Sequence, residues 1–300
     1  MRLYSSCGSR SLAFHRGMNL PKSLYSLILF ACLAGSTVAQ QSKTEVIDDL
    51  ALKLRFQKGL EGLHKTEKGT SLNTLSGQLN RRTTTVKLPE TKLESIHPDE
   101  FYSRCKASVL AVGRLYKCGK CTKWHVSSAS GFALSEDGVI ATNYHVVDSK
   151  EGVALGAMDS NGKTFVVSEV LAANKSDDVA LLRLRDAKLT PLPLAARAPV
   201  GTSVSVISHP DGRYFTMTKG DVSRYFVARS KTGQANRMAI TADYAKGSSG
   251  APVLDSTGAV VGMVSATNSI YYSKVKGHNE NLQMVVKSCV PVDAIHRLLR

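Results

Sequence analysis

From about residue 100 onward, the chain consists of short apolar runs separated by turn sequences. Runs that are rich in Val, Ile and Phe and bounded by Gly, Asp and Ser are typical of β-strands. Three of the turns end in Gly138, Gly162 and Gly258, where a positive φ is often needed. The pattern predicts two groups of strands: 108–116, 128–134, 138–143, 153–158, 164–171 and 179–184, then 203–208, 214–218, 221–227, 237–242, 259–267 and 282–288.

Two groups of short strands at regular spacing predict an all-β fold with two six-stranded antiparallel barrels. The first barrel is expected at about 105–190 and the second at about 195–290, within one domain that covers residues 101–300. At the end of this domain, Ile295, Leu298 and Leu299 would share one side of a helix. We therefore expect a short C-terminal helix after the second barrel.

The region before residue 101 has a different pattern. Ser42 and Glu45 have the spacing of a capping box and are followed by many apolar residues, so residues 40–69 are predicted to form a helical arm or a pro-segment. Residues 70–100 are rich in Thr, Ser, Lys and Arg with little apolar periodicity. Such a composition predicts a linker between the arm and the β-rich domain.

Residues 1–39 have the features of a secretory signal peptide. An apolar run at 24–33 follows a lysine and precedes small residues that end at Ala39, and Met18 is an alternative start. This run is about half as long as the roughly twenty residues that a helix needs to span a bilayer. We therefore expect export to the periplasm or the cell exterior, cleavage near Ala39 and no transmembrane segment after processing. Acylation of Cys32, as in a lipoprotein, stays open as an alternative.

Cleavage after residue 39 leaves four cysteines, an even set that an oxidising compartment can pair. Cys118 and Cys121 flank a tight two-residue turn and are expected to form one disulfide, so Cys105 and Cys289 pair by elimination. A metal site at Cys118, Cys121 and His125 would have only three ligands and no second Cys pair. We therefore expect no metal and no other cofactor.

The net charge of the chain indicates which surfaces it can approach. Cleavage removes four basic residues and no acidic one, which lowers the formal charge from +15 to +11. A charge of this size favours acidic surfaces, such as anionic envelope polymers or lipid headgroups. Nucleic acid is not an expected partner, because no basic patch with interleaved aromatic residues and no nucleic-acid-binding motif accompanies the charge.

Three motifs place a histidine, an aspartate and a serine beside predicted structural elements. His145 follows one strand, Asp178 directly precedes another, and Ser249 lies in a glycine-flanked loop. A serine hydroxyl becomes a nucleophile when an imidazole accepts its proton, and a carboxylate must fix the tautomer of that imidazole. The glycines allow the N–H groups of Gly247 and Ser249 to form an oxyanion hole. The chain order His, Asp, Ser differs from the order Ser, Asp, His of α/β-hydrolases.

With these motifs, residues 105–300 resemble the trypsin/chymotrypsin superfamily, and most closely the protease domain of bacterial HtrA-type enzymes. Four further segments carry the resemblance: 130–133, 207–212, 220–223 and 290–293. The resemblance implies a chymotrypsin-like fold with the active site in the cleft between two barrels, where His145 and Asp178 come from the first barrel and Ser249 from the second. HtrA-type enzymes usually carry a PDZ domain after the protease domain. The sequence ends too soon for one, so regulation by a PDZ domain is not expected.

The resemblance implies a secreted serine endopeptidase that hydrolyses protein or peptide substrates through an acyl-enzyme intermediate. The alternative is an inactive protease fold that serves as a binding module of the cell envelope. The complete set of His145, Asp178, Ser249 and the oxyanion glycine favours the active enzyme. Asp177 is the neighbour that could be confused with the catalytic acid, but Asp178 is the residue directly before the strand.

The primary specificity is expected to depend on three residues. In trypsin-like enzymes the base of the specificity pocket lies six positions before the nucleophile, which is Asp243 in this chain. A buried carboxylate there would select Arg or Lys, because an apolar side chain would leave it without a partner. Ser265 and Thr267 belong to the expected pocket wall, and Thr267 would narrow the pocket and favour small aliphatic residues. Both specificities stay open.

Overall fold

The computed structural model describes residues 45–66, 69–90, 92–149, 151–230 and 233–299, and the expected signal peptide lies outside them. The first β-system of these residues is a seven-stranded antiparallel sheet with the order β2-β1-β3-β4-β7-β6-β5. Because β1 also pairs with β5, this sheet closes on itself. Its strands are β1 (Val109–Lys117), β2 (Trp124–Val126), β3 (Ala129–Ala133), β4 (Val139–Thr142), β5 (Ala154–Met158), β6 (Thr164–Asn174) and β7 (Val179–Leu184).

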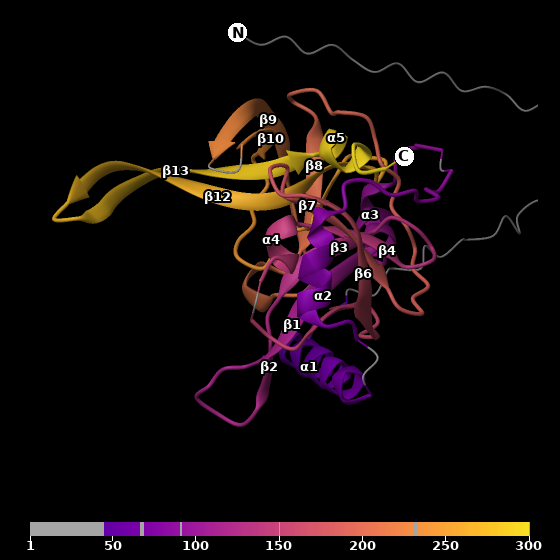
Figure 1. Cartoon of the computed structure of the whole chain (residues 1–300). Coiled ribbons are helices and arrows are strands. Elements are labelled where there is room, and N and C mark those ends of the chain that lie inside the picture. Colours follow the sequence, from indigo (N-terminus) through magenta and orange to yellow (C-terminus); the bar gives the residue numbers. More distant parts are fainter. Residues whose placement is uncertain (1–44, 67–68, 91, 150, 231–232, 300) are drawn as a thin grey trace, which may run out of the picture. The chain divides into compact units, whose positions relative to one another are not determined.

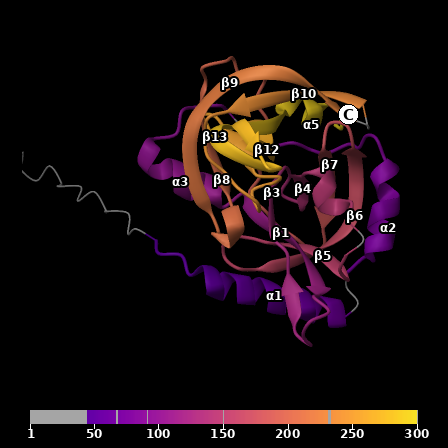
Figure 2. The ribbon, with the colours of Figure 1, turned by 90° about the vertical axis from the view of Figure 1, so that its left-hand side faces the viewer.

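The second β-system is a closed barrel with the order β10-β13-β12-β11-β8-β9. Figure 2 shows most of this barrel above the strands of the first system. The prediction of an all-β fold with two barrels is therefore confirmed, but the first β-system has seven strands where six were expected. The six strands are β8 (Ser203–Ser208), β9 (Thr216–Ser230), β10 (Gly233–Ile240), β11 (Pro252–Leu254), β12 (Val260–Val275) and β13 (His278–Pro291).

The strands of the second barrel differ in detail from the prediction. The expected strands 214–218 and 221–227 form one continuous strand, β9, and the short strand β11 was not expected. The glycine between the two expected strands, Gly220, lies against the backbone of Thr241 and Ala242, where a Cβ atom would overlap its neighbours. The glycine therefore marks a close approach between strands and not a turn.

Helices cover the outside of the β-systems. Asp48 caps α1 by accepting a hydrogen bond from the Ala51 N–H at 2.9 Å, so α1 begins after the expected capping box. Phe56 and Leu60 of α1 are fully buried, and they lie against Gly113 of β1 and Gly156 of β5, respectively. The helices are α1 (Asp49–Lys65), α2 (Leu72–Gly77), η2 (Gln78–Asn80), α3 (Pro98–Lys106), α4 (Tyr144–Val147), η3 (Pro210–Gly212) and the expected C-terminal helix α5 (Val292–His296).

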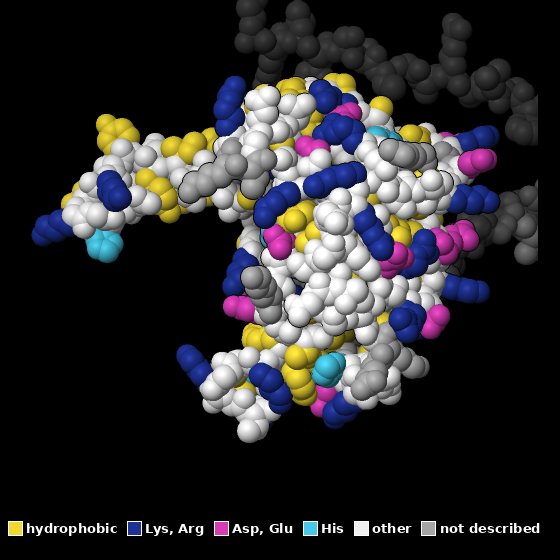
Figure 3. Space-filling view, in the orientation of Figure 1, with side chains coloured by type: hydrophobic (Ala, Val, Ile, Leu, Met, Phe, Trp, Pro, Cys, Tyr) yellow, Lys and Arg dark blue, Asp and Glu magenta, His cyan; other side chains and the backbone are white. Residues whose placement is uncertain are grey.

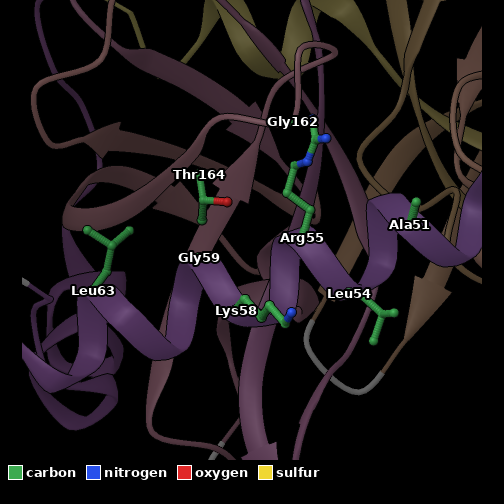
Figure 4. Close-up of a pocket in the computed structure, with 8 residues that line it drawn as sticks. All are labelled: Ala51, Leu54, Arg55, Lys58, Gly59, Leu63, Gly162 and Thr164. Carbon is green, nitrogen blue, oxygen red and sulfur yellow. The ribbon is translucent and has the colours of Figure 1, made fainter.

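A hollow of about 620 Å³ lies between α1 and the turn that leads into β6. Figure 4 shows Arg55 extended toward Gly162 across this hollow. The Arg55 guanidinium donates a hydrogen bond to the Asn161 carbonyl at 3.2 Å. None of the expected catalytic residues lines the hollow, and the Arg55–Asn161 hydrogen bond attaches α1 to the turn before β6.

Residues 70–100, for which the sequence predicts a linker, contain α2, η2 and the start of α3, and α2 and η2 pack against β6. Leu75 and Leu79 are buried in the core. The Gln78 side chain accepts a hydrogen bond from the Val170 N–H at 2.8 Å, and Arg81 donates to the Val170 carbonyl at 2.9 Å. These contacts give hydrogen-bond partners to backbone groups of β6. Two leucines at helical spacing within a polar segment are enough to attach it to the barrel.

The end of the β12–β13 hairpin extends beyond the barrel (Figure 1). Apolar side chains lie along this projecting part (Figure 3). They are exposed residues of both strands: Ile270, Tyr271, Tyr272, Val275, Leu282 and Met284. In the described part of the chain, no helix has the length and apolar character needed to cross a bilayer.

Candidate active site

The pairing of β4 with β7 brings His145 and Asp178 together. Thr142 near the end of β4 lies opposite Ala180 at the start of β7, so the residues just beyond these two strand ends meet. His145 Nδ1 lies 3.0 Å from both carboxylate oxygens of Asp178, and the His145 backbone N–H donates to the same carboxylate at 3.1 Å. A carboxylate beside Nδ1 favours the tautomer with its proton there, which leaves Nε2 as the proton acceptor.

Asp177 and Asp178 have different partners. The Asp177 carboxylate accepts a hydrogen bond from the Arg297 guanidinium at 2.9 Å, and its side chain is only 11% exposed. The Asp178 backbone has a φ of 60°, in the left-handed region that few non-glycine residues adopt. The Asn143 side-chain amide donates to the Asp178 carbonyl at 2.9 Å and supports this turn. The structure therefore brings Asp178, and not Asp177, to the imidazole.

Ser265 connects the carboxylate to the serine loop. Its hydroxyl donates to Asp178 Oδ2 at 2.6 Å, and its backbone carbonyl accepts a hydrogen bond from Ser249 Oγ at 3.3 Å. From sequence, Ser265 is expected only in the pocket wall. Its contact with Asp178 depends on how the two barrels pack, so no local sequence signal points to it.

The loop that carries Ser249 needs glycine at two positions. Gly247 has a φ of 99° and Gly250 a φ of 89°. A Cβ atom at Gly247 would overlap the His209 carbonyl, and one at Gly250 would overlap the Ser130 carbonyl. The two glycines therefore permit both the backbone conformation and the close approach of neighbouring chain segments.

Ser130 attaches this loop to the first barrel. Its N–H donates to the Ser249 carbonyl at 2.8 Å, and its hydroxyl donates to the Gly247 carbonyl at 3.0 Å. Ser248 points into the interior, where its buried hydroxyl accepts a hydrogen bond from the Ser208 hydroxyl at 3.0 Å. Ser249 is only partly buried, so it is the serine of this pair that solvent and substrate can reach.

A cavity of about 230 Å³ lies beside His145 and Ser249, lined by residues of both barrels. Gly247, whose N–H is one of the two expected oxyanion-hole donors, also lines it. Within the described part of the chain, neither the Gly247 N–H nor the Ser249 N–H donates a hydrogen bond. Both donors are therefore available to an oxygen atom of a bound molecule.

The structure corrects the expected role of Asp243. Its side chain is 85% exposed and pairs with the Lys287 ammonium at 3.0 Å, so it is not a buried carboxylate at the base of a pocket. The neighbouring Tyr244 is turned inward, and its hydroxyl faces the carbonyl oxygens of Ala266 at 3.0 Å and Ser288 at 2.9 Å. Burial raises the pKa of Tyr244 above its usual range. The Tyr244 hydroxyl thus lies at the register shift between β12 and β13, beside Ser265 of the expected pocket wall.

Neither expected disulfide is formed in the structure, where all four described cysteines are free thiols. Cys105 is buried beside Gly258, and burial raises its pKa to about 11. Cys289 lies elsewhere, 3.7 Å from the Tyr244 hydroxyl, and burial raises its pKa to about 12. The two thiols have different neighbours in the structure, so the expected pairing of Cys105 with Cys289 by elimination is wrong. The Sγ atoms of Cys118 and Cys121 lie 3.5 Å apart.

His209 makes the stability of the fold depend on pH. It is fully buried and accepts a hydrogen bond from the Phe215 N–H at 3.0 Å, and burial lowers its pKa from 6.5 to about 4. The unfolded chain therefore binds a proton more readily, so this contribution is complete above pH 6.5 and is lost as the pH falls toward 4. Urea unfolding should show a loss of roughly 2–3 kcal/mol from His209 between pH 7 and pH 4.5.

The His209→Asn variant keeps an acceptor near Phe215 and removes the titrating group. It should be less stable at pH 7 but should lose less stability than the wild type over the same pH interval. Equal losses in both proteins would contradict the assignment of this titration to His209.

Comparison with known proteins identifies the fold and its relatives. Residues 129–263, which include His145, Asp178 and Ser249, match the trypsin-like peptidase domain. Protease Do-like 1, chloroplastic, of Arabidopsis thaliana is 35% identical over 151 residues, or 47% of this chain and 34% of the relative. A probable periplasmic serine endoprotease, DegP-like, of Hahella chejuensis is 32% identical over 171 residues, or 56% of this chain and 34% of the relative.

Among solved structures, the Rv3671c protease of M. tuberculosis in its active form is similar in fold. Its TM-score is 0.52 at 22% sequence identity, and the match covers 72% of this chain and 92% of that one. The matched part of this chain spans only about a third of the length of the two relatives above, 34% in each case. The expected resemblance to trypsin-like and HtrA-type proteases is confirmed.

Proposed function

We propose that this chain, whose residues 129–263 form a trypsin-like peptidase domain similar to that of the HtrA and DegP proteases, is an exported serine endopeptidase. One observation carries the proposal: Asp178 contacts His145 and Ser265, and the Ser265 carbonyl holds the Ser249 hydroxyl. These contacts connect a serine, a histidine and a carboxylate from two barrels, and His145 and Ser249 line one cavity, which supports the roles of base and nucleophile.

In the proposed reaction, the Ser249 hydroxyl turns from the Ser265 carbonyl toward His145 Nε2. Catalytic hydrogen bonds often form only when substrate binds, which is consistent with this rotation. Ser249 Oγ then attacks the peptide carbonyl carbon while His145 takes its proton, and the Gly247 and Ser249 N–H groups stabilise the oxyanion. His145 returns the proton to the leaving amine as the peptide bond breaks, which produces an acyl-enzyme. Water hydrolyses the acyl-enzyme by the same steps.

Export is part of the proposal. The predicted signal peptide at 1–39 supports it, and so does the similarity to a relative described as periplasmic. The protein is then found in the periplasm or outside the cell, and its substrates are the proteins or peptides present there. Its basic charge favours binding to acidic surfaces of the envelope.

Digestion of an unstructured protein by the purified full chain tests the proposed activity. We expect new termini at internal sites of the substrate, mapped by mass spectrometry, as an endopeptidase produces. The alternative function, an inactive fold that binds envelope partners, predicts no new termini. A Ser249→Ala preparation, purified in parallel, controls for contaminating proteases.

The inward position of Tyr244 favours substrates with a small side chain on the residue that directly precedes the cleaved bond. Because Tyr244 occupies space beside the expected pocket wall and Asp243 is exposed, we expect matched peptides with Val or Ala to be cleaved at least about tenfold more efficiently than those with Arg or Lys. Asp243→Ser should leave this ratio unchanged. A preference for Arg or Lys that this substitution removes would show that Asp243 forms the pocket base.

A further inference from the structure

Cys118, Cys121 and His125 lie at the tip of the β1–β2 hairpin, which extends at the bottom of Figure 1. Cys118 Sγ is 3.5 Å from Cys121 Sγ, and Cys121 Sγ is 3.1 Å from His125 Nε2. One donor atom from each of the three residues lies within 4.8 Å of the other two. The catalytic proposal uses none of these side chains, and they form a separate cluster of metal-ligating atoms.

Small side-chain rotations would bring the three donor atoms to the separations of ligands around a tetrahedral zinc ion. Zn–S bonds of about 2.3 Å and Zn–N bonds of about 2.0 Å place neighbouring donor atoms roughly 3.5–3.8 Å apart. The sulfur–sulfur separation of 3.5 Å reaches the lower end of this range, and the sulfur–nitrogen separation of 3.1 Å is about 0.4 Å shorter. A disulfide would need the two sulfur atoms about 2.05 Å apart. The cluster is therefore closer to the geometry of a shared metal ion than to that of a disulfide.

The hairpin itself brings the three ligands together. Gly119 has a φ of 73°, which allows the tight turn that returns Cys121 toward Cys118. The pairing of Tyr116 with His125 places the imidazole beside the start of that turn. The rings of these two residues are 5.6 Å apart, so tyrosine restricts the orientation of histidine. Because three ligands are few, no metal is expected from the sequence, and the convergence of the three side chains depends on the conformation of the hairpin.

We propose that Cys118, Cys121 and His125 bind one Zn²⁺ ion, with a water molecule or an external ligand at the fourth position. Both thiols lose their protons on binding, and the two thiolates balance the charge of the ion. Thiolate and imidazole ligands select zinc over magnesium and calcium, which prefer oxygen.

The proposed zinc site connects structurally to the catalytic cavity. Only three residue pairs join β1 to β2, so a metal ion at the tip would fix a short hairpin. Ser127 follows β2 directly, exchanges hydrogen bonds of 3.0 Å with the Arg114 backbone, and lines the cavity beside Ser249. The metal ion therefore stabilises the β1–β2 strand pair, and Ser127 directly after β2 forms part of one wall of the cavity.

Metal analysis of the full chain tests the proposal. The protein is purified in air without reductant, so that both zinc binding and disulfide formation can occur. Its zinc content is then measured by elemental mass spectrometry. We expect one equivalent per chain and, after replacement by Co²⁺, the absorption bands of tetrahedral cobalt with thiolate ligands. Cys118→Ser and His125→Gln should each weaken zinc binding by more than about 100-fold, since even outer-shell changes cost 10–100-fold. Lys120→Ala, in the same turn, should bind zinc as the wild type does.

Two outcomes would overturn the proposal. One is a metal-free protein in which peptide mapping finds a Cys118–Cys121 disulfide. The other is zinc that stays bound in both ligand variants, which would place it elsewhere on the chain. Thermal unfolding of each variant shows that the fold is retained, and the result is independent of peptidase activity.

Discussion

Replacement of Ser249 by alanine is expected to lower kcat/KM for peptide hydrolysis by about 10⁴-fold or more. Without Oγ there is no atom to form the acyl-enzyme, and only the oxyanion hole and substrate binding remain to assist direct attack by water. Initial rates on one fluorogenic peptide, compared with those of the wild type, measure the loss. The variant should stay folded, because Ser249 Oγ makes one long hydrogen bond of 3.3 Å.

Ser248→Ala is the matched control for this experiment. Its hydroxyl is buried against Ser208, so its loss removes a structural hydrogen bond but no nucleophile. We expect the variant to keep kcat/KM within about tenfold of the wild type, because a net hydrogen bond contributes only about 1 kcal/mol. A reversed pattern, with Ser248→Ala inactive and Ser249→Ala active, would refute the assignment.

Asp178→Asn is expected to lower kcat by about 10⁴-fold while the fold is retained. An amide beside His145 Nδ1 can donate a hydrogen bond to this nitrogen, which moves the imidazole proton to Nε2 and removes the base that Ser249 needs. The contact between the two side chains, at 3.0 Å, makes His145 sensitive to this change. Measured kcat values at neutral pH test the prediction.

Asp177→Asn separates this effect from a general loss of carboxylate charge. Asp177 pairs with Arg297 near the C-terminus, so the substitution should weaken that ion pair and change kcat little. If both aspartate variants lost activity to the same extent, the damage would come from the shared turn and not from His145.

Much of the fold was predictable because each barrel strand is short, apolar and bounded by turn residues. All six strands predicted for the first barrel are present, and only the short β2 was not expected there. The triad candidates were also accessible from sequence, since each lies at a strand end or in a glycine-flanked loop. In the second barrel, the predicted break between 214–218 and 221–227 is absent, because Gly220 permits a close contact with Thr241 and Ala242 that the local sequence does not show.

The remaining features depend on contacts between distant parts of the chain. Ser265 reaches Asp178 across 87 positions of sequence, and no local pattern indicates that pair. Counting back from Ser249 leads to Asp243, but the sequence does not show which of two adjacent side chains turns inward. Tyr244 does so, because its hydroxyl reaches carbonyl groups of β12 and β13. The buried neighbours of Cys105 and Cys289 likewise could not be read from an even number of cysteines.

The most direct test of the central claim is to trap the acyl-enzyme and locate it. The wild-type protein is mixed with an activated ester of a small acylated amino acid, quenched in acid within the first turnover and digested for mass spectrometry. We predict an acyl group on the peptide that contains Ser249, assigned by fragmentation to Ser249 and absent from the Ser249→Ala variant. An acyl group on another residue, or no acyl group under conditions where the ester is consumed, would contradict the account.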